Sequence, residues 1–238
     1  MLLYYIRHGD PIYDPDQLTP LGKRQAEAVG KRLAVHGMDK IYSSTSTRAY
    51  QTAQPLAEML KKDITQLEFC HENLAFKDLS VTLPDGRKTW AFCHPAMMKL
   101  FNSPAVRKLD EQWYDHPAFA EYPFKKGIQR IQREADAFLE SLGYRHDREN
   151  HTYEAIRPNE DRVALFAHEG FGLAFLSSVL DIPYPMFCTH LAMSHTGVTV
   201  IEFKEWEHVI FARALMVAND GHLYREGLPT NYHNYIRV

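Results

Sequence analysis

LLYYIRHG, residues 2–9, is an apolar and aromatic strand pattern that stops abruptly at a cation, an imidazole and a glycine. In open α/β sheets, ligands bind in the crevice outside the carboxyl ends of the strands. We therefore expect Arg7 and His8 to lie where chemistry takes place, and Gly9 to let a bound group approach the backbone closely. Three residues of this kind also recur by chance, so the motif gains weight only from the segments that follow it.

Strand and helix patterns alternate along most of the chain. Thr19 and Pro20 are typical of a helix start, and Gly37 of the end of the same helix. The other expected elements are a strand at 41–42, a helix from about 49 to 60, a strand at 65–69, a helix at 127–143, an apolar strand at 163–167, a helix at 172–180, and strands at 197–201 and 209–212. This order predicts an α/β three-layer sandwich, with a mainly parallel sheet and helices on both faces.

Residues 77–125 interrupt this alternation with prolines and a dense set of aromatic residues. A chain of 238 residues can form one domain, so we expect a single domain over residues 1–238 with an insertion or lid at about 77–125. Its aromatics, among them Trp90 and Trp113, have two interpretations: a cluster that holds a long excursion together, or a lid that shapes a pocket. Both can be true.

Composition narrows the function classes. The net charge of -3 argues against a broad nucleic-acid or anionic-membrane surface. No apolar run approaches the roughly 20 residues that span a bilayer, and the N-terminal stretch lacks the basic region and cleavage site of a signal peptide. The three cysteines cannot all pair within one chain, so the expectation is a reduced, cytoplasmic protein.

Thirteen histidines raise the question of a metal site. Cys70, His71, Cys93 and His94 form two adjacent Cys-His pairs that could act as a ligand set. Adjacent residues on a strand point to opposite faces, however, and neither pair has the two-to-four-residue gap usual in zinc sites. We therefore expect no metal, and keep these four residues as the alternative.

Polar groups follow three of the predicted strands: Arg7 with His8, the SSTSTR segment at 43–48, and His168. Hydroxyls and free backbone N–H groups at a helix start favour an anion, whereas Arg48 is unfavourable there unless an anion is bound. Two guanidiniums and two imidazoles suit a phosphoryl group, because arginine offers forked donors that match its oxygens. An imidazole that is neutral near pH 7 can also act as a nucleophile.

The chain resembles the histidine phosphatase superfamily, in the branch similar to cofactor-dependent phosphoglycerate mutases. The motifs that carry this resemblance are RHG at 7–9, LTPLGKRQA at 18–26, SSTSTRAYQTA at 43–53, the strand-end His168 and NDGHL at 219–223. They cover most of the chain outside 77–125. The resemblance implies that His8 is phosphorylated during turnover, that Arg7, Arg48 and His168 hold the phosphoryl oxygens, and that Glu72 is the general acid.

Departures from the mutase pattern favour a phosphatase. DPI at 10–12 and NLAF at 73–76 stand where mutases carry other substrate-contacting residues. We expect a metal-independent phosphomonoester hydrolase without a cofactor, acting on a small phosphorylated metabolite, with Asp10 and Glu169 as further substrate-binding residues. Glu169 is also the alternative acid, since the acid-phosphatase branch has an Asp at that place. A phosphoglycerate mutase-type phosphotransferase, a non-catalytic phosphate-binding protein and a homodimer stay open.

Overall fold

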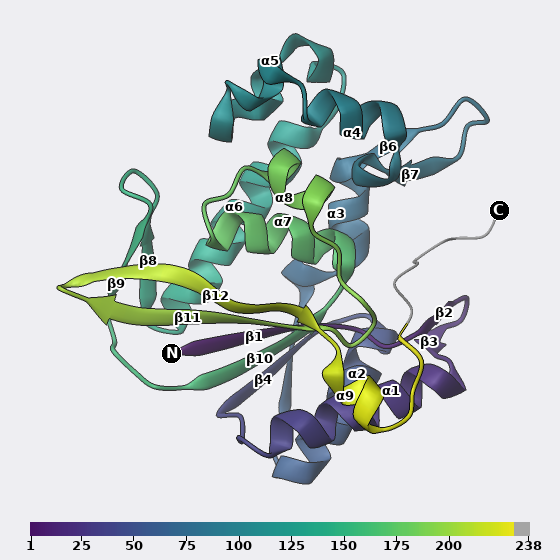
Figure 1. Cartoon of the computed structure of the whole chain (residues 1–238), viewed down its shortest axis with the longest axis vertical. Coiled ribbons are helices and arrows are strands. Elements are labelled where there is room, and N and C mark those ends of the chain that lie inside the picture. The colour runs from purple at the N-terminus through teal and green to yellow at the C-terminus, as the bar shows by residue number, and fades with distance from the viewer. Residues whose placement is uncertain (231–238) are drawn as a thin grey trace.

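The computed structural model describes residues 1–230, and a mixed β-sheet lies at its centre. Within that range the sheet has eight strands in the order β5-β4-β10-β1-β11-β12-β9-β8 (Figure 1). Their bounds are β1 (Leu2–Arg7), β4 (Lys40–Ser44), β5 (Ile64–Leu67), β8 (Tyr144–Asp147), β9 (Thr152–Ala155), β10 (Arg162–Ala167), β11 (Val198–Trp206) and β12 (Val209–Asn219). Strands β5, β4, β10 and β1 run parallel, whereas β11, β12, β9 and β8 extend the sheet through antiparallel pairs.

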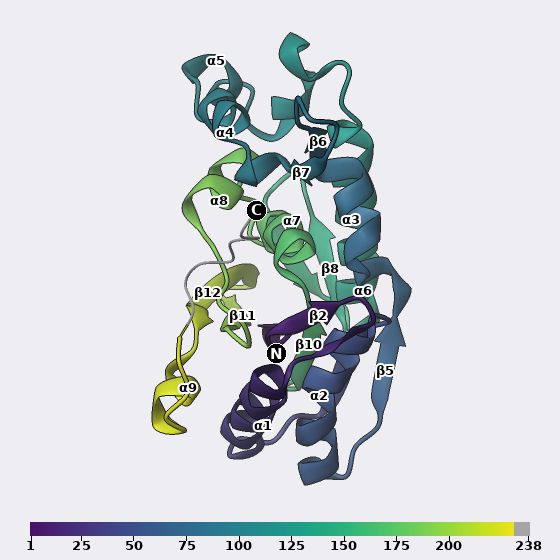
Figure 2. The ribbon, with the colours of Figure 1, turned by 90° about the vertical axis from the view of Figure 1, so that its right-hand side faces the viewer.

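Helices cover both faces of the sheet. Helices α1 (Pro20–Ala34) and α2 (Thr47–Leu60) lie on one side, and α6 (Phe124–Ser141) and α7 (Glu169–Val179) on the other (Figures 1 and 2). Strand β1 alternates between the two layers: Leu3 and Tyr5 belong to the core with α6 and α7, Tyr4 and Ile6 to the core with α1 and α2. A strand covered on both faces is apolar throughout. The predicted α/β sandwich is confirmed, and the antiparallel half extends it.

The packing of the start of α1 explains why residue 9 is a glycine. The Thr19 hydroxyl accepts the N–H of Gly22 at 2.9 Å and caps the helix, as predicted. A Cβ on Gly22 would lie 2.2 Å from the Asp10 carbonyl oxygen, and one on Gly9 2.7 Å from the Gly22 carbonyl oxygen. The expectation that Gly9 faces a bound group is therefore wrong, because the α1 backbone occupies that side.

The segment 77–125 folds as a helical cap beside α7 and α8 (Tyr184–His190), at the upper end in Figure 1. The segment begins with the last turn of α3 (Glu72–Leu79). It continues with the hairpin of β6 (Ser80–Thr82) and β7 (Lys88–Trp90), with α4 (Pro95–Phe101) and α5 (Pro104–Arg107), and with three short 3-10 turns. Trp113 is 1% exposed and packs on Phe101, Phe119, Phe124 and Tyr184, so it belongs to the core of the cap. Trp90 lies instead on Gly170 in the first turn of α7, where a Cβ would come 2.3 Å from its ring.

Some elements differ from the sequence expectations. The strand expected to reach Phe69 ends at Leu67, because Glu68–Cys70 form a 3-10 turn. The hairpin of β2 (Pro11–Tyr13) and β3 (Asp16–Leu18), the β8–β9 hairpin and α9 (Gly221–Arg225) were not predicted. These strands are only three or four residues long, which leaves little periodicity to detect.

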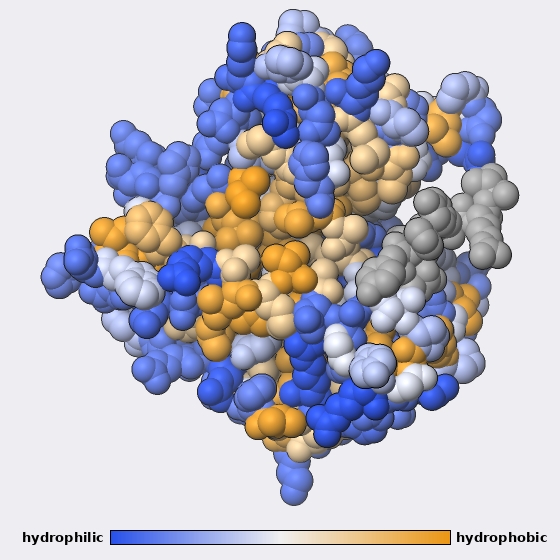
Figure 3. Space-filling view, in the orientation of Figure 1, coloured by the Kyte–Doolittle hydropathy of each residue, from blue (hydrophilic) through white to orange (hydrophobic). Residues whose placement is uncertain are grey.

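One surface is notably apolar. Phe211 and Leu215 on β12 are 48% and 51% exposed, and hydrophobic residues gather over β12 in the middle of the face in Figure 3.

Within residues 1–230, no helix combines the length and hydropathy required to cross a bilayer.

Candidate active site

Three parallel strands end at the same edge of the sheet. β10 lies between β1 and β4, pairing Ala167 with Arg7 and Phe166 with Ser43. The segments that follow these strands therefore meet in space, although they are far apart in sequence. Arg7 with His8, His168, and the loop into α2 come together as the sequence predicts.

His8 is 1% exposed, and its ring is held by its own backbone. His8 Nδ1 lies 2.7 Å from the Gly9 carbonyl oxygen, and because a carbonyl only accepts, Nδ1 carries the proton. Burial lowers the pKa of His8 well below its ordinary value, and His168, Arg7 and Arg48 lower it further. The imidazole is therefore neutral at pH 7, with the lone pair on Nε2.

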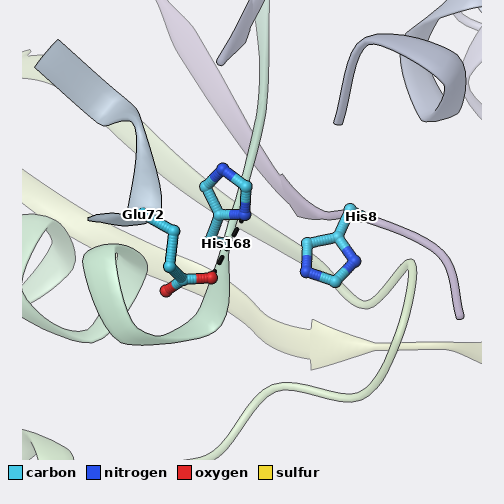
Figure 4. A group of neighbouring side chains, drawn as sticks. All are labelled: His8, Glu72 and His168. Atoms are coloured by element: carbon cyan, nitrogen blue, oxygen red, sulfur yellow. Dashed lines mark ion pairs between the residues drawn. The ribbon is translucent and has the colours of Figure 1, made fainter. Parts of the chain in front are cut away.

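His8, His168 and Glu72 form a compact group (Figure 4). One ligand-type atom of each lies within 4.8 Å of the others. Glu72 Oε2 is 3.1 Å from His168 Nδ1, and the two histidine rings are 5.2 Å apart between centroids. A carboxylate from α3 thus reaches the histidines that follow β1 and β10.

Glu72 also caps a helix. Its Oε1 accepts the backbone N–H groups of Gly170 at 3.0 Å and Phe171 at 3.3 Å, in the first turn of α7. Burial acts to raise the pKa of Glu72, but His168 and the guanidiniums of Arg48 and Arg7 outweigh it, so the net shift is downward. Glu72 is a carboxylate at neutral pH.

His168 is fully buried and fixed at both its backbone and its ring. The Tyr5 hydroxyl donates to the His168 carbonyl oxygen at 2.6 Å and accepts the His168 N–H at 3.2 Å. The hydroxyls of Ser44 and Ser46 lie 2.9 and 3.2 Å from His168 Nε2. Burial lowers the pKa of His168, even though Glu72 opposes this shift.

Arg48 is compensated by a carboxylate from the β2–β3 hairpin. Its Nη1 donates to Asp16 Oδ1 at 2.7 Å, and Asp16 Oδ2 accepts the Thr47 N–H at 2.8 Å. Nη2 lies 3.2 Å from His168 Nδ1. The Asp16 carboxylate therefore already offsets the charge of Arg48 at this helix start, and the expected binding of a phosphoryl anion there stays a prediction.

Arg7 is 3% exposed and is held by groups of the 193–195 loop and α7. Its Nη1 lies 3.0 Å from Glu169 Oε2 and donates to the Met193 carbonyl oxygen, and its Nη2 lies 3.1 Å from His195 Nε2. The Nε atoms of Arg7 and Arg48 are buried and, among the described residues, have no hydrogen-bond acceptor. Two charged N–H donors at one site are therefore unsatisfied.

Residues 3–78 match the family model of the histidine phosphatase superfamily (branch 1), and this stretch includes Arg7, His8, Arg48 and Glu72. Over these residues the chain is similar to that superfamily. Its predicted resemblance to the phosphoglycerate mutase-like branch is confirmed. The chain is 24% identical over 153 residues to putative phosphoserine phosphatase 2 of Hydrogenobacter thermophilus, covering 60% of the chain and 68% of that protein.

A second relative is the mitochondrial serine/threonine-protein phosphatase Pgam5 of Caenorhabditis elegans. It is 31% identical over 134 residues, which cover 54% of this chain but only 40% of Pgam5. Among solved structures, mycobacterial glucosyl-3-phosphoglycerate phosphatase has a TM-score of 0.59 at 20% identity, covering 91% of this chain and 98% of its own. Phosphoserine phosphatase of Entamoeba histolytica in complex with 3-phosphoglyceric acid has a TM-score of 0.59 at 18% identity, covering 93% and 98%. These structures share the fold.

The two further substrate-binding candidates, Asp10 and Glu169, each contact protein groups at the edge of the site. Asp10 Oδ2 accepts from the Thr19 hydroxyl at 2.7 Å, and Oδ1 lies 3.6 Å from His195 Nδ1. Glu169 pairs with Arg7 through Oε2 and accepts the Met193 N–H at 3.0 Å through Oε1. Asp10 therefore supports α1 and faces His195, while Glu169 joins Arg7 to the 193–195 loop.

Sequence reasoning missed Asp16, His195 and Tyr5. Asp16 lies in the β2–β3 hairpin, which was not predicted. The sequence pattern indicated for Tyr5 only a place in an apolar strand. His195 directly precedes Thr196 and Gly197 at the start of β11, which pairs with β1. The predicted strand at 197–201 was the available signal, because an antiparallel neighbour of β1 begins where β1 ends.

Cys70, His71, Cys93 and His94, the alternative set of metal ligands, have other contacts in the structure. His71 Nδ1 and His94 Nδ1 accept backbone N–H groups at the starts of α3 and α4. Burial raises the pKa of the Cys70 thiol to about 12 and that of Cys93 to about 11, which disfavours the thiolates that bind metals. Within residues 1–230 these four side chains form no common cluster of ligand atoms.

The state of His8 can be measured by long-range ¹H–¹⁵N NMR, with its signals assigned as those lost in His8→Gln. Because its pKa is lowered, the protonated form should appear only below the ordinary value of 6.5. We expect a neutral ring with the proton on Nδ1 from pH 8 down through pH 6.5, where an ordinary histidine would be half protonated. A midpoint near 6.5, or a proton on Nε2, would contradict this geometry.

Proposed function

We propose that the protein is a phosphomonoester hydrolase that works through a phosphohistidine intermediate on His8. The observation that carries the proposal is a neutral, buried imidazole whose Nδ1 is bonded to Gly9, beside two buried guanidiniums with unsatisfied Nε–H donors. Phosphoryl oxygens would satisfy these donors, and Nε2 would supply the electron pair. The relatives and solved structures named above are called phosphatases, which supports the same reaction class.

In the first step, His8 Nε2 attacks phosphorus in line with the ester oxygen. The N–P bond forms as the P–O bond breaks, and the bonding pair leaves with the alkoxide. Arg7, Arg48 and His168 hold the equatorial oxygens and stabilise their negative charge. Glu169 orients Arg7, Asp16 orients Arg48, and the Tyr5 hydroxyl holds the backbone of His168. Little reorganisation therefore accompanies the reaction.

The leaving alkoxide needs a proton, and we assign its transfer to Glu72. The choice rests on position, because Glu72 lies in the cluster with His8 and His168, whereas Glu169 pairs with Arg7 and the Met193 N–H. Glu72 is ionised at neutral pH, so the proton must arrive with the substrate; a phosphomonoester monoanion, with a second pKa of about 6, carries one. In the second step Glu72 takes a proton from water, which attacks phosphorus and breaks the N–P bond, so that the bonding pair returns to His8 Nε2. The proton on Glu72 then leaves with orthophosphate, which restores the carboxylate.

This chemistry requires no metal ion. Two guanidiniums supply the charge that Mg²⁺ supplies at other phosphoryl-transfer sites. Arg48 Nη2 lies 3.7 Å from Glu72 Oε2 and 3.2 Å from His168 Nδ1, so a cation bound by these two residues would meet a fixed positive charge. Small phosphorylated metabolites remain the proposed substrates.

A panel of phosphomonoesters assayed for orthophosphate release in EDTA tests the proposal. We expect turnover without added cation, and His8→Ala should retain less than about 1% of it because the attacking group is lost. His208→Ala, at a side chain 98% exposed, is the matched histidine control. Transfer between substrate hydroxyls without phosphate release would indicate a mutase, and binding without turnover a phosphate-binding protein. Loss of activity in EDTA that a divalent ion restores would show metal dependence.

Two carboxamide variants test the acid. Glu72→Gln should lower kcat/KM for alkyl phosphates by about 10²-fold or more but that for p-nitrophenyl phosphate much less, because kcat/KM reports the first step and p-nitrophenolate leaves without a proton. Glu169→Gln should lower both activities by a similar factor, since it weakens the pairing of Arg7. The reverse pattern would assign the acid to Glu169.

A further inference from the structure

The 193–195 loop supplies two of the three acceptors that hold the Arg7 guanidinium. Glu169 binds Nη1 from α7, while the Met193 carbonyl oxygen and the His195 ring come from the loop. The Glu169 carboxylate and the Met193 carbonyl both contact Nη1, and among the described residues His195 is the partner of Nη2. Because only His195 holds the second end of the guanidinium, the orientation of the guanidinium plane depends on His195.

The contact with Arg7 fixes the tautomer of His195. A guanidinium has only donors, so His195 Nε2, 3.1 Å from Arg7 Nη2, must accept. The ring proton is then on Nδ1, which faces Asp10 Oδ1 at 3.6 Å. Burial, and then Arg7, lower the pKa of His195 to about 3, so that the ring is neutral throughout the physiological range.

The backbone around His195 is anchored to the nucleophile strand. The Thr196 N–H lies 3.1 Å from the Arg7 carbonyl oxygen and 3.3 Å from that of His8. The Thr196 hydroxyl donates to the His195 carbonyl oxygen at 2.7 Å and lies 2.9 Å from His222 Nε2. His222 belongs to the NDGHL motif, which thus has a structural connection to the site through Thr196.

The position of His195 also brings it beside the proposed nucleophile. Its side chain is 8% exposed, and its ring centroid lies 5.8 Å from that of His8. It therefore shares the buried space around His8 with Arg7 and His168. A neutral acceptor in this place can orient Arg7 without adding a third positive charge near His8.

We propose that His195 is a positioning residue that holds Arg7 in the orientation that matches the equatorial oxygens of the transferring phosphoryl group. The proposal rests on the phosphohistidine reaction proposed above and adds a residue to it. Because the trigonal oxygens of the transition state differ in direction from those of bound orthophosphate, the loss of this orientation should harm the transition state more.

Inhibition constants separate this role from a purely structural one, because they do not depend on the fraction of protein that is folded. Vanadate, which adopts a trigonal-bipyramidal geometry, and orthophosphate serve as the two probes against hydrolysis of p-nitrophenyl phosphate. His195→Leu removes the acceptor at similar volume, and His195→Gln keeps a neutral acceptor. His208→Ala is the histidine control.

We expect His195→Leu to lower kcat/KM by about 30-fold or more and to reduce the preference for vanadate over orthophosphate by about tenfold. His195→Gln should keep most of the wild-type kcat/KM and most of the preference for vanadate over orthophosphate. Equal behaviour of the Leu and Gln variants, or inhibition constants unchanged in His195→Leu, would overturn the role of His195 while the hydrolase assignment stands. A wild-type protein without phosphomonoesterase activity would instead overturn the proposed function.

Discussion

Two arginine side chains, Arg7 and Arg48, are buried beside two histidines at one edge of the sheet, and most of the site follows from this constraint. An unpaired buried charge costs several kcal/mol, so each guanidinium has a carboxylate partner, Glu169 or Asp16. The same burial and positive charge keep His8 neutral. The pairing leaves both Nε–H groups unsatisfied, and a phosphoryl group offers the acceptors that they lack.

Helix α7 connects this charged centre to the cap. Glu72 begins α3, the first helix of the cap side, and its carboxylate accepts the N–H groups of Gly170 and Phe171 at the start of α7. Trp90 lies on Gly170 at the same turn. Movement of the cap relative to α7 would therefore shift the Glu72 carboxylate. Trp113, by contrast, is buried within the cap and stabilises its interior.

Features set by local pattern could be predicted from the sequence. The apolar strands β1 and β10, the cap of α1 at Thr19, and the polar groups after three strands were predicted and are present. Asp16 could not be predicted, because its role depends on the β2–β3 hairpin folding over α2. His195 depends on an antiparallel strand joining an otherwise parallel set. Gly9 was misread because a glycine pattern cannot tell whether a ligand or a helix backbone takes the space.

The central claim is that the phosphoryl group passes through His8, and mass spectrometry of the trapped intermediate tests it most directly. The wild-type protein and Glu72→Gln are mixed with p-nitrophenyl phosphate, whose leaving group needs no proton, and quenched in alkaline detergent, since phosphohistidine is lost in acid. The account predicts one phosphoryl group on the peptide containing His8, more of it in Glu72→Gln, and none in His8→Ala. Turnover with an unmodified His8, or a phosphoryl group on another residue, would contradict it.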